Sequence, residues 1–137
     1  MNADAVASLA VATLEGSLPF PRIVGELVAQ GVEYYHVDYV SKSFTFYGDG
    51  GAVVSAALLF EGLPPVSREW NGAALKEAII DSQRNGQKFR QFCVRAMSAG
   101  VQGYFAFLRG QRVTYLGRHG DQHVEWFPGA GPGDDQR

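Results

Sequence analysis

The sequence predicts an α+β fold in which an α-α-β-β-β unit occurs twice in tandem, with antiparallel meanders packed against helices. Three observations lead to this prediction. Segments 69 residues apart resemble each other, as at Gly31 and Gly100, helical periodicity precedes this glycine in each copy, and strand-like alternation follows it. Because 137 residues is near the commonest domain size, we expect a single domain over 1–127, made of two pseudo-repeats, 1–60 and 70–127.

The repeat is clearest after the second predicted helix of each copy. Two hairpins that follow two helices would share some turn residues without any duplication. The positions at which the helices break also coincide, however, and this favours a true duplication. Without any gap, the matched pairs are Gly31/Gly100, Val32/Val101, Tyr35/Tyr104, Thr45/Thr114, Gly48/Gly117 and Gly51/Gly120.

Each copy begins with two amphipathic helices. Asn2 and Asn71 suit the first cap position, where a side-chain oxygen accepts a backbone N–H. Gly16 is a left-handed stop for the first helix. Pro21 is expected as the first residue of the second helix, where a missing N–H costs nothing. Cys93 lies on the apolar face of the last helix, so we interpret it as a core residue and not as a nucleophile.

Three strands follow in each copy. Tyr35, Val37 and Tyr39 alternate onto one face of the first strand, as the period of a β-strand requires. The double proline of the segment 61–66 forbids regular structure and indicates a linker. The tail 128–137 is expected to be disordered. Turns are expected at 41–42, 49–50, 109–110 and 119–120, and third strands at 53–59 and 122–127.

Composition narrows the class of protein. One cysteine excludes an intramolecular disulfide and fits a reducing compartment. No apolar run approaches the ~20 residues that span a membrane. The apolar run 6–14 has no basic residue before it, unlike a signal peptide. We therefore expect a cytoplasmic protein without a membrane partner.

The two copies differ most on their first strands. His36 and Asp38 stand where the second copy has Phe105 and Phe107. The polar pair either forms a solvated face or lines a cleft, in which the carboxylate could orient the imidazole. The two phenylalanines are expected to be covered by another element or by a second subunit.

A second polar group lies near the end of the chain. His119 and His123 form a His-x₃-His pattern, but on a turn and a strand the two rings need not converge on a metal. His123 and Glu125 lie two apart on a predicted strand and so face the same way. Such a pair is a surface ion pair or half of a site.

The net charge is −2, but the charged side chains are unevenly distributed along the chain. Residues 1–69 carry eight acidic and three basic side chains, and residues 70–137 carry six acidic and nine basic ones. Between Ser82 and Gly120 there are seven basic residues and no acidic one. Opposite charge favours docking of the two halves or of two subunits. A pI of 5.9 and the lack of a known motif weigh against a nucleic-acid partner.

Several short motifs together resemble a known family. The motifs span 31–38, 99–105 and 123–128, with the helix from Phe89 to Gly100 between them. In order and spacing, the chain is similar to the phage envelope protein-like (YbcV-like) group of small bacterial proteins of unknown function. The resemblance implies a single α+β domain without an assigned activity. His36, Asp38, His123 and Glu125 match the family's pattern, which makes them site candidates.

Two functions compete on this basis. The leading hypothesis is a non-enzymatic binding or assembly module, a homodimer that buries Phe105 and Phe107. The alternative is a small-molecule or metal-dependent enzyme that uses His36, Asp38, His123 and Glu125, with His36 and His123 as candidate metal ligands. That alternative requires the four side chains to converge within about 4–6 Å. The sequence assigns no cofactor.

Overall fold

The computed structural model describes residues 1–131, and within them it contains four helices and six strands. The helices and strands of the first half are α1 (Ala3–Glu15), α2 (Phe20–Ala29), β1 (Val32–Asp38), β2 (Ser43–Gly48) and β3 (Val53–Ala57). Those of the second half are α3 (Gly72–Asn85), α4 (Phe89–Ser98), β4 (Val101–Phe107), β5 (Arg112–Gly117) and β6 (Gln122–Trp126).

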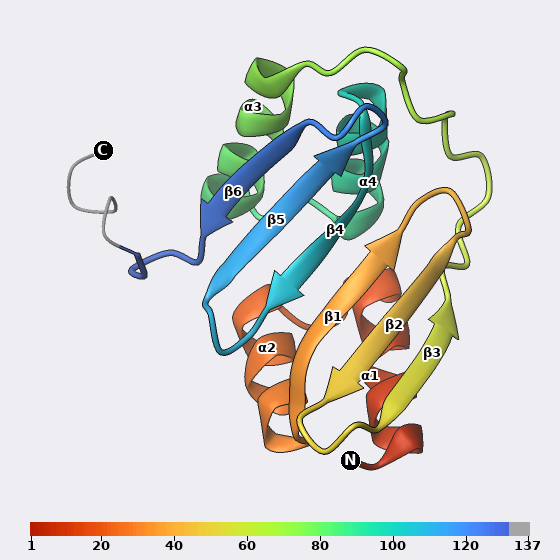
Figure 1. Cartoon of the computed structure of the whole chain (residues 1–137), viewed down its shortest axis with the longest axis vertical. Coiled ribbons are helices and arrows are strands. Elements are labelled where there is room, and N and C mark those ends of the chain that lie inside the picture. Colours follow the sequence, from red (N-terminus) through yellow and green to blue (C-terminus); the bar gives the residue numbers. More distant parts are fainter. Residues whose placement is uncertain (132–137) are drawn as a thin grey trace.

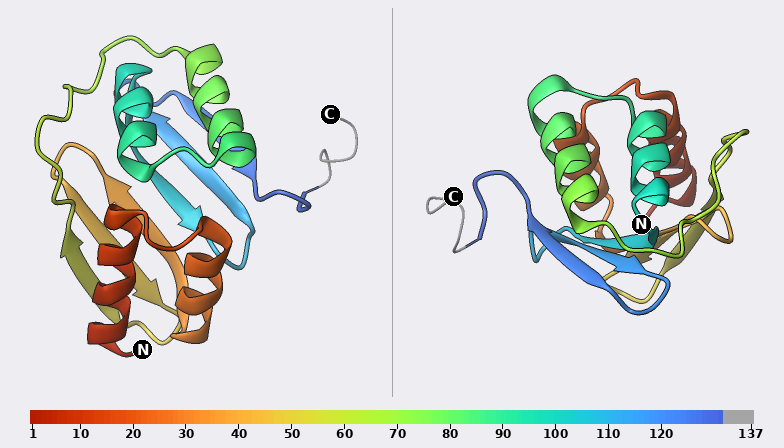
Figure 2. Two further views of the ribbon diagram at one scale, coloured as in Figure 1. Left: turned by 180° about the vertical axis from the view of Figure 1, so that it is seen from behind. Right: turned by 90° about the horizontal axis from the view of Figure 1, so that it is seen from above.

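The two meanders form one antiparallel sheet (Figure 1). The strand order is β3-β2-β1-β4-β5-β6, so the halves join where β1 pairs with β4. All four helices cover the same face of this sheet, and the other face carries no helix (Figure 2). The predicted α+β class is confirmed, and the element order fits the predicted repeat.

The halves are related by an internal pseudo-twofold axis between β1 and β4. His36 pairs directly with Phe105, which is its equivalent 69 residues later. Hydrogen bonds across the junction are also reciprocal. The Tyr39 N–H donates to the Gln102 carbonyl at 2.9 Å, and the Leu108 N–H donates to the Glu33 carbonyl at 3.0 Å. Each of these four residues also has its equivalent 69 positions away, so the repeat spacing of the sequence appears as symmetry in space.

Local signals place the helix ends as expected. Asn2 Oδ1 accepts from the Ala5 N–H at 3.0 Å, and Asn71 Oδ1 accepts from the Ala74 N–H at 3.0 Å. Gly16 ends α1 with φ +67°, in the left-handed region that glycine adopts without strain. Both ends of α1 are therefore determined by local hydrogen bonding and backbone conformation.

A few boundaries differ from the prediction. Helix α2 begins at Phe20 with Pro19 as its cap, so Pro21 is the second helical residue, a position that also needs no N–H partner. The third strands end at Ala57 and Trp126, earlier than expected, because their pairing with β2 and β5 ends there. Within the tail, residues 128–129 form a turn that is closed by a hydrogen bond from the Ala130 N–H to the Phe127 carbonyl. The expected disorder of 132–137 falls outside the described residues.

The core lies between the helices and the covered face of the sheet. Tyr35 and Val37 of β1 point into it, as do Tyr104 and Ala106 of β4. Cys93 is completely buried there, which confirms its interpretation as a core residue. Burial raises the pKa of its thiol to about 12, so the thiolate is not available as a nucleophile at neutral pH. Within residues 1–131, no helix is both long and apolar enough to cross a membrane.

Candidate functional site

The uncovered face of the sheet holds the most distinctive group of side chains. Strand register determines which residues share this face, since laterally paired residues point the same way. His36 pairs with Phe105, Phe105 with Thr114, and Thr114 with Val124. This row crosses the sheet on the side opposite the core residues.

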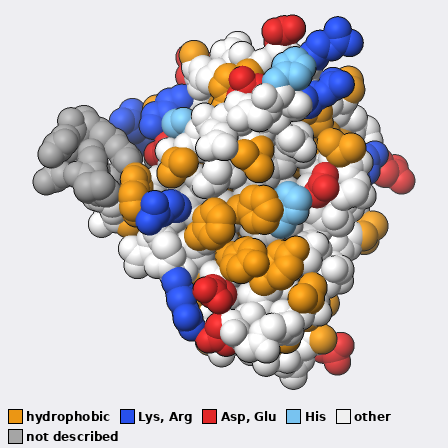
Figure 3. All heavy atoms as spheres, in the orientation of Figure 1, with side chains coloured by type: hydrophobic (Ala, Val, Ile, Leu, Met, Phe, Trp, Pro, Cys, Tyr) orange, Lys and Arg blue, Asp and Glu red, His pale blue; other side chains and the backbone are white. Residues whose placement is uncertain are grey.

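Five rings on β1, β2 and β4 form a continuous aromatic cluster at the middle of this face. The centroids of Tyr47 and Tyr34 are 4.6 Å apart, and those of Tyr34 and Phe107 are 5.8 Å apart. Phe107 lies 5.9 Å from Phe105, whose ring stacks on His36 at 4.2 Å and 8°. Figure 3 shows hydrophobic side chains gathered at this position, with acidic and basic groups around them. We call these five residues the aromatic cluster.

His36 belongs to this cluster. Burial against its neighbours lowers the pKa of the imidazole, while the charge of Asp38 partly opposes this effect. A neutral, stacked imidazole behaves as a further aromatic ring at neutral pH. The ring has room because Gly103 lies beside it: an added Cβ there would be 3.4 Å from His36 Nε2 and 2.5 Å from the Val37 carbonyl oxygen.

Asp38 serves the turn that follows β1. Its Oδ1 accepts from the backbone N–H groups of Val40 at 2.9 Å and Ser41 at 3.0 Å. Burial alone would raise the pKa of this carboxyl, but these hydrogen bonds outweigh the effect and lower it. The carboxylate therefore holds the backbone of the turn.

His123 and Glu125 lie on the opposite, helix-covered face. His123 pairs with Tyr115, and Tyr115 with Tyr104, both of which are core residues. Glu125 Oε1 is 3.0 Å from His123 Nε2 and 3.0 Å from Lys76 Nζ of α3. The hydrogen bond from His123 lowers the pKa of the Glu125 carboxyl, burial opposes this, and Lys76 lowers it further.

The four polar candidates therefore do not converge as the enzyme alternative would require. His36 and Asp38 point away from the helices, whereas His123 and Glu125 point toward them. The alternation of β-strand side chains produces this separation, because β1 and β6 place their polar positions in opposite phases of the pleat. His36 and His123 cannot share a metal ion, and residues 1–131 contain no group of three His, Cys, Asp or Glu arranged to hold one.

A hollow of about 420 Å³ opens on the uncovered face beside the aromatic cluster. Tyr34 and Phe107 contribute an aromatic wall, and two arginines contribute positive charge. Arg109 makes an exposed ion pair with Asp49 at 2.6 Å. The full lining is Glu33, Tyr34, Phe107, Arg109, Gly110, Arg112, Thr114 and Val124.

Arg112 is held in a defined orientation at this hollow. Its guanidinium carbon lies 4.1 Å from the ring centroid of Trp126, the residue with which it pairs across β5 and β6. Its Nε donates to the Gly110 carbonyl at 3.3 Å. This arrangement leaves the two terminal nitrogens, which form the fork that binds carboxylates, without a hydrogen-bond partner among the described residues.

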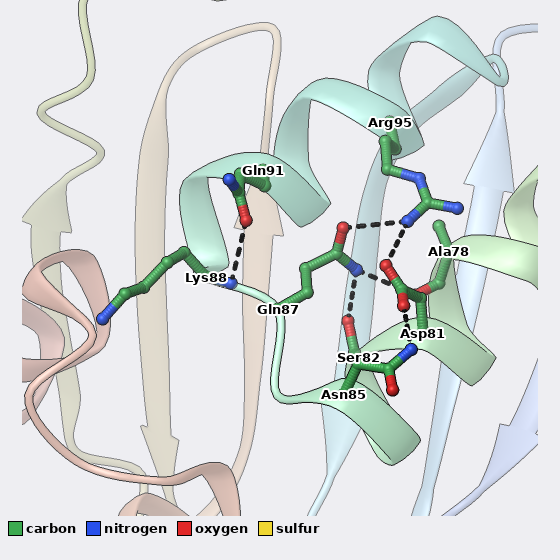
Figure 4. Close-up of polar contacts among 8 residues, drawn as sticks. All are labelled: Ala78, Asp81, Ser82, Asn85, Gln87, Lys88, Gln91 and Arg95. Atoms are coloured by element: carbon green, nitrogen blue, oxygen red, sulfur yellow. Dashed lines mark hydrogen bonds and ion pairs between the residues drawn. The ribbon is translucent and has the colours of Figure 1, made fainter.

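The basic stretch of the second half makes mostly internal contacts. Arg95 of α4 binds Asp81 of α3 at 2.7 Å and Gln87 Oε1 at 3.0 Å, and Gln87 in turn donates to Ser82 (Figure 4). Further contacts are Arg90 with the Glu61 carbonyl, Arg118 with the Val66 carbonyl, and the contacts of Arg109 and Arg112 given above. These arginines fasten segments of the chain to one another.

The hollow is not predicted from the sequence, in which Arg112 is one charge in a basic run and Trp126 carries no separate signal. The sequence does contain a signal for this surface. Arg112 and Thr114 lie two apart near one predicted strand, and Val124 and Trp126 lie two apart on the next, so each pair shares a face. The equivalent positions in the first copy are Ser43, Thr45, Ser55 and Ala57.

Comparison with known proteins identifies the family. Residues 10–124 match the family described as "Protein of unknown function (DUF1398)". The chain belongs to this family. The match runs from within α1 to within β6, so the matched region includes strands of both halves of the sheet. No curated protein sequence matches the chain at a significant level.

Proposed function

We propose that this protein is a non-enzymatic assembly module that forms a homodimer through the uncovered face of its sheet. The observation that carries the proposal is the aromatic cluster, a contiguous group of five rings on a face without a helix. Contiguous apolar patches on a soluble protein mark interaction sites more often than chance. Phe105 and Phe107 are the central contacts of this proposed interface.

A second copy of the chain is the occupant that the geometry favours. The cluster lies on and beside the central strands β1 and β4. A twofold axis through the middle of the face, parallel to the sheet, therefore places one cluster on the other. An isologous contact of this kind requires the same patch on both subunits, and the cluster meets that requirement.

The charge distribution favours one orientation of the pair. The first half of the chain has an excess of acidic side chains and the second half an excess of basic ones. A twofold axis parallel to the strands places β3 of one copy over β6 of the other, so that halves of opposite charge meet. An axis perpendicular to the strands would place like charges together. Complementary charge fixes register and excludes the wrong arrangement.

The size of the face sets the expected affinity. Six strands at about 4.8 Å spacing and about six residues at 3.3 Å each cover roughly 600 Å². Twice this area lies near the lower limit of specific interfaces, about 1,200 Å² in total. We therefore expect a reversible dimer with a dissociation constant in the micromolar range and not an obligate one.

Analytical ultracentrifugation between about 1 and 200 μM tests the proposal. Wild type is expected to sediment as a concentration-dependent mixture of monomer and dimer. Phe105→Asp is expected to be monomeric throughout, because it puts a charge at the centre of the apolar contact. The matched control is Val11→Asp, which makes the same charge change at an exposed position on α1. A wild type that stays monomeric at 200 μM, or a control that dissociates as readily as Phe105→Asp, would refute it.

We further propose membership of the phage envelope protein-like group and a cytoplasmic location. The motif residues given above support the first. The single, fully buried cysteine is in keeping with the second. Neither proposal assigns an activity.

A further inference from the structure

We propose that the hollow beside the aromatic cluster is a binding site for a small aromatic carboxylate. In this assignment the carboxylate is held by the terminal nitrogens of Arg112, and the ring of the ligand lies against Tyr34 and Phe107. The inference rests on the lining of the hollow in a single copy. Because the proposed dimer would cover this face, the site is also tested in a monomeric variant.

The orientation of Arg112 is the first argument. An arginine on a protein surface ordinarily samples many rotamers, and fixing it costs conformational entropy. Here the stack on Trp126 and the hydrogen bond to Gly110 limit the guanidinium plane before any ligand arrives. A planar fork fixed in this way matches the two oxygens of a carboxylate, and preorganisation reduces the entropic cost of binding.

Trp126 also contacts the end of the described chain. A Cβ added to Gly131 would lie 2.2–2.7 Å from atoms of the indole ring, so the backbone of Gly131 lies directly against it. Gly131 also has φ +85°, a conformation that suits glycine. The indole that supports the guanidinium thus has a contact of its own with the backbone.

The apolar lining is the second argument. The rings of Tyr34 and Phe107 lie 5.8 Å apart and tilted by 32°, leaving an aromatic surface at one side of the hollow. Val124 supplies an aliphatic contact, and Thr114 supplies a hydroxyl. A flat ring fits such a surface through offset or edge contacts. The volume of about 420 Å³ lies within the range of small-molecule sites and accommodates a ring with a short substituent.

The charges around the hollow limit the ligand to a single negative charge. Arg109 is balanced by Asp49, and Glu33 also belongs to the lining. Arg112 thus faces one lining carboxylate and has no ion pair among the described residues. A monocarboxylate satisfies the free fork, whereas a dianionic phosphate would meet greater repulsion from Glu33.

The first half of the sheet provides an internal comparison. At the positions equivalent to Arg112 and Trp126, it has Ser43 and Ala57. At the position equivalent to Val124 it has Ser55. The backbone is repeated but the charged fork, its aromatic support and the aliphatic wall are present in one copy alone. The proposed site is thus a feature of the second half and not of the fold in general.

Benzoate, with benzamide as its neutral analogue, is the probe for a titration followed by ¹H–¹⁵N NMR. Benzoate is expected to bind with a dissociation constant of about 1–10 mM, as for a fragment of this size. Shifts are expected to centre on Tyr34, Phe107, Thr114 and Val124. Benzamide is expected to bind at least about tenfold more weakly, because it lacks the charge that the fork recognises.

Two variants and one control separate the site from general anion binding. Arg112→Gln is expected to weaken benzoate binding at least about tenfold. Val124→Trp, which fills the hollow while keeping Arg112, is expected to abolish it. Arg22→Gln makes the same charge change on α2, where Arg22 pairs with Glu26, and is expected to alter binding less than twofold. Circular dichroism and thermal unfolding verify that each variant is folded.

The titrations are repeated in the Phe105→Asp background, whose substituted residue does not line the hollow. Binding that persists there is a property of the single chain and is read separately from any loss of self-association. Equal affinity for benzamide, shifts scattered over the surface, equal effects of Arg112→Gln and Arg22→Gln, or no saturable binding in either background would overturn the proposal.

Discussion

Replacing Glu125 by glutamine tests how α3 is fastened to the edge of the sheet. The Glu125 carboxylate is nearly fully buried, and its Oε1 binds both His123 of the same strand and Lys76 of α3 at 3.0 Å. Glutamine keeps the shape and one acceptor oxygen but removes the negative charge. The substitution thus isolates the electrostatic part of the contact.

The expected loss of stability depends on how exposed the partners of Glu125 are. A hydrogen bond to a charged group contributes about 1.5–3 kcal/mol. The Lys76 side chain is 42% exposed and can return to solvent, so its share is discounted to about 0.5–1 kcal/mol. Because the amide oxygen of glutamine still accepts one hydrogen bond, we expect the free energy of unfolding to fall by about 1–2 kcal/mol. This corresponds to a Tm lower by roughly 3–8 °C.

The pH dependence of this loss has a defined sign. The folded state lowers the pKa of the Glu125 carboxyl below its ordinary value. Its contribution to stability is therefore fully present above the unfolded pKa of about 4.3 and disappears as the pH falls through the lower folded value. The difference between wild type and Glu125→Gln should be present at pH 7 and should shrink below about pH 4.

Urea unfolding monitored by tryptophan fluorescence and by circular dichroism measures these quantities. Glu77→Gln is the matched control, because Glu77 is exposed and lies on α3 beside Lys76; it should alter the free energy of unfolding by less than about 0.5 kcal/mol. A double-mutant cycle with Lys76→Met should give a coupling energy of about 0.5–1 kcal/mol. The reasoning fails if Glu125→Gln is as stable as the control, if the loss persists undiminished at pH 3, or if the two substitutions are strictly additive.

Two further substitutions test packing at single atoms. Gly100→Ala should lower the free energy of unfolding by at least about 2 kcal/mol in urea, because φ is +98° there and the new Cβ would lie 2.5 Å from the Glu69 carbonyl oxygen. The control, Gly50→Ala, has open space around it and should change stability by less than about 0.5 kcal/mol. Equal effects of the two substitutions would contradict this reasoning. Tyr39→Phe should leave stability unchanged or raise it by up to about 1 kcal/mol, since the buried hydroxyl has no nitrogen or oxygen partner among the described residues and meets only the weak Cys93 thiol. A loss above 1 kcal/mol would show that the hydroxyl is better satisfied than its surroundings indicate.

Much of the fold could be predicted because its signals are local. The caps at Asn2 and Asn71, the stop at Gly16 and the alternation around Tyr35 each depend on residues within a few positions of one another. Hydrogen bonding and steric limits act over this range whatever the rest of the chain does. The buried position of Cys93 followed from the same helical periodicity.

The candidate site was less accessible to such reasoning. In β6, His123 and Glu125 occupy one phase of the pleat and Val124 and Trp126 the other, and neither phase is clearly the apolar one. The polar phase faces inward, where Lys76 of α3 neutralises Glu125. That contact joins residues 49 positions apart, so no local pattern reveals it.

By itself, the sequence determined the order of helices and strands and their approximate ends, and it indicated a repeat that the element order fits. The tertiary structure decided that β1 pairs with β4, and with this that His36 stacks on its own repeat equivalent, Phe105. It also decided that His36 and Asp38 lie on the face opposite to that of His123 and Glu125. Arg112 and Trp126 come together beside the hollow for the same reason. Local elements follow from short-range sterics and hydrogen bonds, whereas pairing between distant strands is chosen by the burial of the whole core. The surface that carries the proposed interface and the proposed binding site therefore depends on the pairing between distant strands.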